Sequence, residues 1–440
     1  MSEESLMVSK VKRLYKQLCQ DEWNSTTVGI LVGLFSVLIM AWWRPWGAVG
    51  AVKNWGEWIL YGVGVYKDAP TSALIASGSV IGIGFVAGAF LSANLGNQFA
   101  LRIPPMLEMV KAVAAGIFMG VGATLAGGCN VGGFYNAIGN LSAHGFAMML
   151  GLVFGAIVGL KYIYWEMENI SWGSGGAKTI DFPKAIQALL GIATILALAW
   201  GAYKYSSSDE AYIASLGGLI LISAALGYIF QRGRWCMIQG FREPHMTGNC
   251  TMAKSVALSI CIVAIGACVL KYSVPVRASL VPGTFASVVE AIEDEAPDID
   301  MDAILDEISG IAVLQDSRPV LETGNYVRGT FGWGGVVGGL LFGFGAILAG
   351  GCGTGTLWRV GEGQIKLWIV TPVFGVTCAL LGNWVQANGY EAAGKLGSRV
   401  YMPGTFLGYG GSLALILLAM AAWYVIADWN EESNKFVVEM

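Results

Sequence analysis

The 440-residue sequence predicts an all-α polytopic membrane protein with about ten transmembrane or re-entrant helices in two inverted-topology repeats. Three observations support this fold class. Hydrophobic residues make up 55% of the chain and charged residues only 13%, against roughly 25% charged residues in soluble domains. Long segments contain no charge at all, and one glycine-rich motif occurs twice in the chain.

The charge-free segments give the number of helices. A spanning helix needs about 20 mainly apolar residues. One segment is long enough for two such helices, so we expect ten crossings, beginning at Thr26 and without a cleaved signal peptide. The segments are 26–43, 69–101, 112–160, 185–203, 211–231, 255–270, 329–358, 367–390 and 400–427.

The N-terminus indicates the orientation. Residues 8–18, "VSKVKRLYKQL", space their apolar side chains on one helical face and place Lys10, Lys12, Arg13 and Lys16 elsewhere. This pattern predicts a basic amphipathic helix on anionic membrane lipid, on the cytoplasmic side according to the positive-inside rule. The predicted outer loop 44–68 is at odds with that rule, because it carries Arg44, Lys53 and Lys67.

The remaining chain is divided by charge and hydropathy. Acidic residues concentrate in "EAIEDEAPDIDMDAILDEI", which interrupts the apolar part. We therefore expect a multi-pass protein of a bacterial or archaeal plasma (inner) membrane. Its parts are a cytoplasmic segment 1–25, a first transmembrane part 26–273, an acidic extramembrane insertion 274–328, a second transmembrane part 329–427 and a cytoplasmic tail 428–440.

The internal repeat is the most informative feature. "GIFMGVGATLAGGC" (116–129) aligns without gaps on "GLLFGFGAILAGGC" (339–352), with nine of fourteen positions identical. These are the third and eighth expected crossings, so they run in opposite directions, a plan that recurs in transporters. Residues 86–102 and 225–242 are also loosely similar to each other. In the ten-crossing arrangement, however, the spans that precede these two segments run in the same direction. Either that likeness is spurious or some segments are re-entrant.

Each repeat ends in two glycines and a cysteine, which predicts an interrupted helix. Inside a bilayer such a break is tolerated only within protein or beside a watery path. A half-helix after the break directs its positive end at that path and suits an anion. A thiol there without a cationic neighbour is expected to stay neutral and to contact a soft sulfur or selenium atom. The predicted binding residues are Gly127, Gly128, Cys129, Asn130, Gly350, Gly351, Cys352 and Gly353.

A third cysteine, Cys236, lies in "QRGRWCMIQGFREPHMTGN" (231–249) beside Arg234, which we add to the predicted site. The arginines of this stretch line an inner vestibule or contact lipid phosphate. Alternatives remain open for the motif cysteines: they are packing residues, or Cys129 and Cys352 form a disulfide. The other cysteines are assigned to packing or, for Cys19, to the N-terminal helix. Two histidines, His144 and His245, are too few for a zinc site, and no metal or cofactor is predicted.

"LAGGCNVGGFYNAIGNLSAHG", "GRWCMIQGFRE" and "LAGGCGTGTLWRVGEGQ", with "RPWGAVGAVKNWGEW" (44–58), resemble the YeeE/YedE sulfur-transport family. The resemblance covers most of 26–427. It implies an hourglass-shaped inverted-repeat protein that takes up thiosulfate or related compounds, with Cys129, Cys236 and Cys352 at constrictions. The insertion 274–328 and the basic N-terminus depart from the family pattern and leave the substrate open.

The sequence thus predicts a non-enzymatic importer of a sulfur-containing anion, with thiosulfate as the first candidate, passing through a cysteine-lined central constriction. No ATP-binding domain is recognisable, which favours a channel-like or facilitated route. A cytoplasmic sulfur-carrier protein is a candidate partner, and nothing indicates nucleic-acid binding. Three alternatives remain: transport of a selenium compound, a membrane sulfurtransferase or thiol oxidoreductase that forms a cysteine persulfide, and a partner-docking protein.

Overall fold

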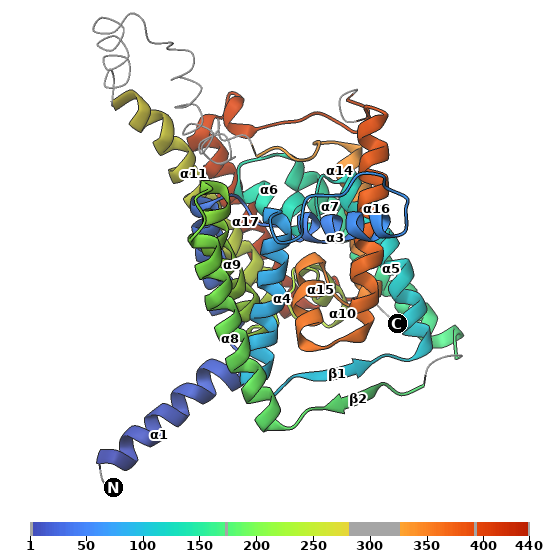
Figure 1. Ribbon diagram of the computed structural model, residues 1–440. Coiled ribbons are helices and arrows are strands. Elements are labelled where there is room, and N and C mark those ends of the chain that lie inside the picture. The colour runs from blue at the N-terminus through green and yellow to red at the C-terminus, as the bar shows by residue number, and fades with distance from the viewer. Residues whose placement is uncertain (1–2, 172–174, 281–325, 391–393, 439–440) are drawn as a thin grey trace, which may run out of the picture.

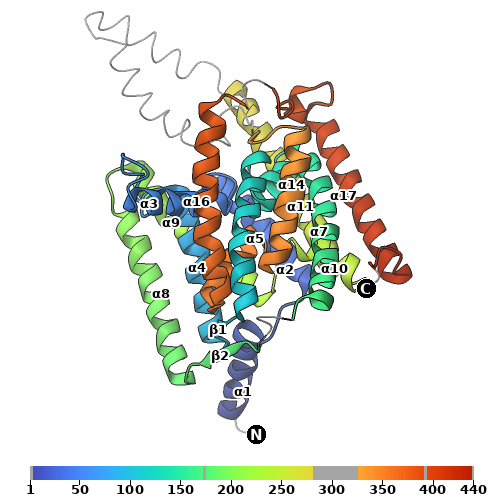
Figure 2. The same cartoon turned by 90° about the vertical axis from the view of Figure 1, so that its right-hand side faces the viewer.

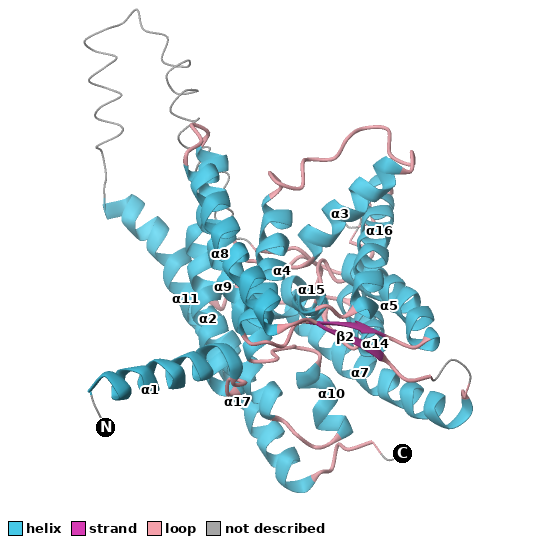
Figure 3. Cartoon of the chain, turned by 60° about the horizontal axis from the view of Figure 1, so that its bottom comes forward, coloured by secondary structure: helices cyan, strands magenta, loops and turns pink. Residues whose placement is uncertain are grey.

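A computed structural model describes residues 3–171, 175–280, 326–390 and 394–438. Within these residues, ten helices are long and apolar enough to cross a membrane. The described residues are mostly helical, with one small sheet (Figures 1 and 3), which confirms the all-α polytopic fold class. The ten helices are α2 (Ser25–Trp42), α4 (Ser77–Leu95), α5 (Met106–Leu125), α7 (His144–Asn169), α8 (Lys184–Ser206), α9 (Ala211–Arg232), α11 (Thr251–Leu280), α14 (Trp333–Ala349), α16 (Ile365–Ala387) and α17 (Gly408–Ser433).

The two ends of the bundle differ. At one end lie the N-terminal helix α1 (Glu3–Tyr15) and a small antiparallel sheet of β1 (Ala100–Ile103) and β2 (Lys178–Asp181) (Figure 1). We call this the inner end, following the positive-inside assignment, and the opposite one the outer end. Apolar side chains of α1 are exposed, including Leu14 (55%), as expected for a helix on a lipid surface. Its binding to lipid stays a prediction.

Helices α5 and α14, which end in the two cysteine motifs, pack closely against each other. A Cβ atom added to Gly122 would lie 2.4 Å from the backbone nitrogen of Phe342, and one added to Gly338 would lie 2.6 Å from that of Ala126. Residue numbers therefore rise along one helix as they fall along the other, and the two helices run in opposite directions. Small residues allow this close approach between membrane helices.

The other long helices surround this pair. α7 packs on α14 and α16 packs on α5, while α4 packs on α9 and α2 packs on α11. α8 and α17 stand at the periphery (Figure 2). The arrangement is compatible with two inverted repeats, α2–α8 and α9–α17, but the repeat of whole halves stays a prediction.

Four segments too short to span a membrane fill the centre of the bundle. α3 (Val49–Gly62) and α6 (Asn136–Gly139), which follows a π-helical turn (Asn130–Tyr135), lie in the outer half. α10 (Gln239–Met246) and α15 (Gly353–Glu362) lie in the inner half (Figure 1). These short helices place the two cysteine motifs between the long ones.

The predicted outer loop 44–68 is wrong for most of its length. Residues Val49–Gly62 form α3, which packs between α4 and α16. A Cβ atom on Gly56 would lie 2.2 Å from the carbonyl carbon of Gly375, so the two backbones touch. The segment resembled a loop because it carries charges, whereas the glycine spacing that allows this packing has no distinctive sequence pattern.

The predicted domain boundaries are not tested, since 281–325 of the acidic insertion lie outside the described residues. Two helices run past the expected limits. α11 continues to Leu280, beyond position 273, and α17 continues to Ser433, beyond position 427.

Candidate functional site

The first cysteine motif interrupts the chain after α5. Gly127 has φ +73°, a left-handed conformation that favours glycine. The amide of Gly128 donates to the Ala123 carbonyl (2.8 Å) and closes the helix. Cys129 then begins the π-helical turn, and its carbonyl accepts from the Gly133 amide (2.7 Å).

The second motif has nearly the same backbone after α14. Gly350 has φ +76°, and the Gly351 amide donates to the Ala346 carbonyl (3.1 Å). Cys352 caps α15 with φ −75° and ψ −179°, close to the values of −69° and −179° at Cys129. The glycines at both motifs therefore end one helix and let the next begin at the cysteine.

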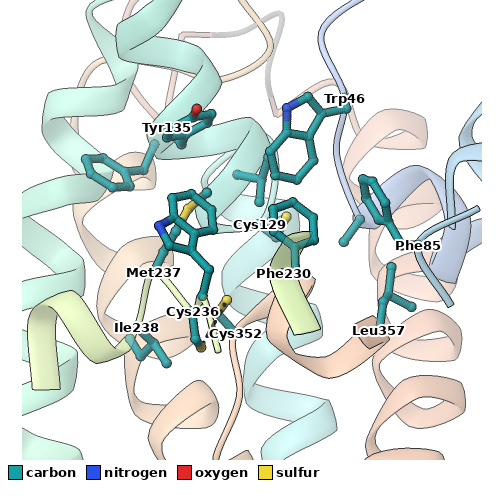
Figure 4. Packing of buried hydrophobic residues seen from close by; sticks show 14 of the residues in the cluster. Trp46, Phe85, Cys129, Tyr135, Phe230, Cys236, Met237, Ile238, Cys352 and Leu357 are labelled. Atoms are coloured by element: carbon teal, nitrogen blue, oxygen red, sulfur yellow. Dashed lines mark hydrogen bonds between the residues drawn. The ribbon is translucent and has the colours of Figure 1, made fainter. Parts of the chain in front are cut away.

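The fold brings the three motif cysteines together (Figure 4). The Cys236 and Cys352 sulfurs lie 3.5 Å apart. A Cβ atom on Gly353 would lie 3.1 Å from the Cys129 sulfur, so Cys129 adjoins the start of α15. Asn130 joins the two motifs, since its Oδ1 accepts from the Gly353 amide (3.1 Å). All three thiols are fully buried, and all eight cysteines are free, which excludes the Cys129–Cys352 disulfide.

A cavity of about 490 Å³ leads to Cys129 from the outer half of the bundle. Among the described residues, its lining holds four cationic side chains and no carboxylate. The lining includes Arg44, Trp46, Gly47, Lys53, Thr124, Gly127, Gly128, Cys129, Tyr326, Arg328, Cys378 and Arg399. Cys378, which we assigned to packing alone, therefore forms part of the cavity wall.

Two cations of the cavity, Lys53 and Arg44, differ in how their charge is compensated. Lys53 forms an ion pair with Glu57 (Nζ to Oε1, 3.7 Å). The Nε atom of Arg44 is buried and has no hydrogen-bond partner among the described residues. Burial and the nearby Arg328 lower the pKa of Arg44 to about 10, so its guanidinium stays protonated at neutral pH. Cations that repel one another in a concave site attract an anion.

The inner end contains Arg234, which the sequence placed in the site. Its Nη1 lies 2.5 Å from Oε2 of the buried Glu362, whose Oε1 accepts from Arg102 (2.8 Å). The guanidinium that approaches a motif thiol is instead that of Arg359, with Nη1 3.9 Å from the Cys236 sulfur. The sequence reasoning missed this residue, although Arg359 follows Cys352 by seven positions and so lies on the same helical face.

The sequence reasoning also missed the outer cations Arg44 and Lys53. Their signal was present as a violation of the positive-inside rule in 44–68. Charged side chains at membrane depth are costly and usually face the protein interior or a water-filled cavity. The structure accounts for both side chains, because both line the outer cavity.

Sequence comparison assigns residues 2–158 and 301–438 to the family described as Sulphur transport. The matched residues include Cys129 and Cys352 but not Cys236.

Three relatives extend this match. The chain is 25% identical over 411 residues to the probable transporter YedE of Salmonella typhimurium, covering 88% of this chain and 87% of that protein. It is 24% identical over 418 residues to the probable transporter YedE of Escherichia coli, with the same two coverages. The thiosulfate transporter TsuA of E. coli is 30% identical over 223 residues, about half of each chain (50% and 49%). The chain therefore belongs to the YeeE/YedE family of sulfur transporters.

Proposed function

We propose that this protein imports a small sulfur-containing anion, thiosulfate in the first instance, across the bacterial inner membrane. The observation that carries the proposal is the cavity with four cations that ends at Cys129, with Cys236 and Cys352 directly behind it. The printed name of one relative, a thiosulfate transporter, supports this choice of substrate, and the bacterial sources of the relatives support the membrane.

The chemistry of the two regions suits different parts of such an ion. The outer cations offset the loss of water around a doubly charged oxyanion as it enters a low-dielectric space. Beyond them, the polarisable sulfur atoms of the thiols contact the terminal sulfur that sulfate lacks. The cavity therefore accounts for capture, and the three thiols account for the preference for sulfur.

We propose a channel-like or facilitated route in which consumption of the anion inside the cell maintains the gradient. A cytoplasmic sulfur-carrier protein is the partner that this route suggests. This partner stays a prediction.

The proposal is tested by uptake of labelled thiosulfate into proteoliposomes that hold the wild-type protein or single alanine variants. Cys129→Ala, Cys236→Ala and Cys352→Ala are each expected to lose most uptake while keeping normal membrane insertion. Cys250→Ala is the matched control, because this buried cysteine packs against α17 and lies outside the three motifs. Wild-type rates in all three motif variants would refute the cysteine path.

Two further measurements separate the alternatives. Excess sulfate should not compete with labelled thiosulfate, whereas strong competition by sulfate would contradict recognition of a terminal sulfur. Mass spectrometry during transport should find no persulfide that forms and disappears in step with uptake. Such a persulfide would favour the sulfurtransferase alternative.

A further inference from the structure

Arg359 and the two inner thiols converge on one point of α15. A Cβ atom placed on Gly355 would lie 2.8 Å from the Cys236 sulfur, 3.3 Å from the Cys352 sulfur and 3.4 Å from Nη1 of Arg359. Nη1 also donates to the Gly350 carbonyl (2.6 Å). The Arg359 guanidinium therefore contacts the loop before Cys352 and also lies close to the Cys236 sulfur.

The charge of Arg359 is not neutralised by a carboxylate. Among the described residues, three other arginines near the inner end have such partners: Arg102 and Arg234 share Glu362, and Arg242 lies 3.8 Å from Glu243. The buried Arg232 is held by neutral acceptors, including the Gln98 side chain (2.5 Å). Arg359 forms no ion pair there. Its hydrogen-bond partners are a carbonyl and a thiol, and its guanidinium carbon lies 4.6 Å from the centroid of the Trp358 ring.

Unused hydrogen-bond donors lie at the start of the same helix, α15. Asn130 Nδ2 and the hydroxyls of Thr354 and Thr356 are buried, and none has a hydrogen-bond partner among the described residues. Asn130 is fixed at the start of α15 by its bond from Gly353, and the two threonines belong to the first turns of α15. Buried donors without partners are costly, so a ligand that accepts from them gains their hydrogen bonds.

We infer that Arg359, Cys236 and Cys352 form a second anion-binding site, on the inner side of the constriction and separate from the outer cavity. Its ligand is a small oxyanion that carries a terminal sulfur. The guanidinium binds the oxygen atoms through its planar fork, and the thiols contact the sulfur. On binding, Arg359 exchanges the Gly350 carbonyl for the anion. This inference rests on the proposed transport function. It adds that Arg359 binds the anion on the inner side before the anion is released.

The test compares right-side-out and inside-out membrane vesicles, using thiosulfate as the probe. Arg359→Gln is expected to raise the half-saturating concentration about tenfold or more when thiosulfate is presented from the inner side. The value from the outer side should stay within about twofold, because the outer cations are unchanged. Arg359→Lys should be intermediate, since lysine keeps the charge and loses the fork. Lys254→Gln, a cation of α11 already paired with Asp428 (2.9 Å) and outside the three motifs, is the matched control and should match the wild type.

Gly355→Ala provides an independent variant with every charge in place. Its new methyl group would occupy the space between the two sulfurs and should weaken binding from the inner side in the same way. Equal effects of Arg359→Gln from both sides, or no effect from the inner side, would overturn the inner site. Absence of saturable thiosulfate transport by the wild type in both vesicle orientations would instead overturn the proposed function itself.

Discussion

The outer and inner cysteine motifs share a backbone but differ in their surroundings. Cys129 and Cys352 have almost the same φ and ψ, and each follows a glycine in the left-handed region. Cys129 faces a cavity of about 490 Å³. The Cys352 sulfur instead accepts from the Gly355 amide (3.3 Å) and lies 3.5 Å from Cys236. The same local structure thus serves an open outer side and a closed inner side.

The residue that follows a buried tryptophan accounts for much of this difference. Trp46 and Trp235 both donate to a serine hydroxyl, that of Ser36 (2.7 Å) and that of Ser255 (3.3 Å). After Trp46 comes Gly47, which lines the outer cavity and has open space where a side chain would be. After Trp235 comes Cys236, whose sulfur closes on Cys352. Gly47 has no side chain and leaves the outer side open, whereas the Cys236 thiol closes the inner side.

The largest effect is expected from removing the opening at Gly47. In Gly47→Trp, an indole would fill much of the outer cavity and should abolish thiosulfate uptake, with little change in melting temperature because no atom lies within 4 Å of the added Cβ. Gly62→Trp is the matched control, since this glycine at the end of α3 also has open space around it and lies outside the cavity lining. Normal uptake by Gly47→Trp would show that the outer cavity is not the entrance.

The two left-handed glycines should differ in their cost to stability. Alanine in this conformation costs about 1–2 kcal/mol from backbone strain alone, which is the effect expected for Gly350→Ala. Gly127→Ala should be more harmful, because its Cβ would also lie 2.3 Å from the Arg328 carbonyl oxygen, whereas nothing lies within 4 Å at Gly350. Melting temperatures in detergent measure both, and equal losses would contradict the tighter packing of the outer motif.

Thiol labelling distinguishes the open side from the closed one. A membrane-impermeant maleimide added from outside should label Cys129 slowly through the cavity and leave Cys236 and Cys352 unlabelled, since all three are buried but only Cys129 lines the cavity. Cys236→Gly, which imitates Gly47 on the inner side, should make Cys352 reactive to the same reagent added from the inner side. Peptide mapping measures the result. Rapid labelling of Cys352 in the wild type would contradict the difference between an open outer side and a closed inner side.

The smallest effects are expected among the outer cations. Arg44→Gln removes a buried charge that stays protonated at neutral pH and should raise the half-saturating thiosulfate concentration about tenfold. Lys53→Gln should raise it only about twofold, because Glu57 already offsets that charge. Uptake measured over a range of concentrations gives both values. A larger effect for Lys53 would mean that the ion pair opens when the anion binds.

The sequence by itself determined the long helices and the two breaks. A bilayer offers no hydrogen-bond partners to free backbone groups. An apolar segment of about twenty residues therefore crosses it as a helix, in which those groups bond to one another. The consecutive glycines before Cys129 and Cys352 act locally, because a left-handed residue ends a helix wherever it stands. These features depend on neighbours within a few positions, which is why the fold class and the breaks could be predicted.

Which charges line the outer cavity and which lie beside the motif thiols depends on how the helices pack. Arg234 and Glu362 are 128 positions apart, and Cys236 and Arg359 are 123 positions apart, so no spacing foretold that one arginine takes a carboxylate and the other approaches a thiol. The same holds for Cys378, whose place in the cavity wall depends on how α16 packs against α5. Long-range pairings are fixed by helix packing as a whole, because a side chain's partner is set by where distant helices place it and not by the residues beside it.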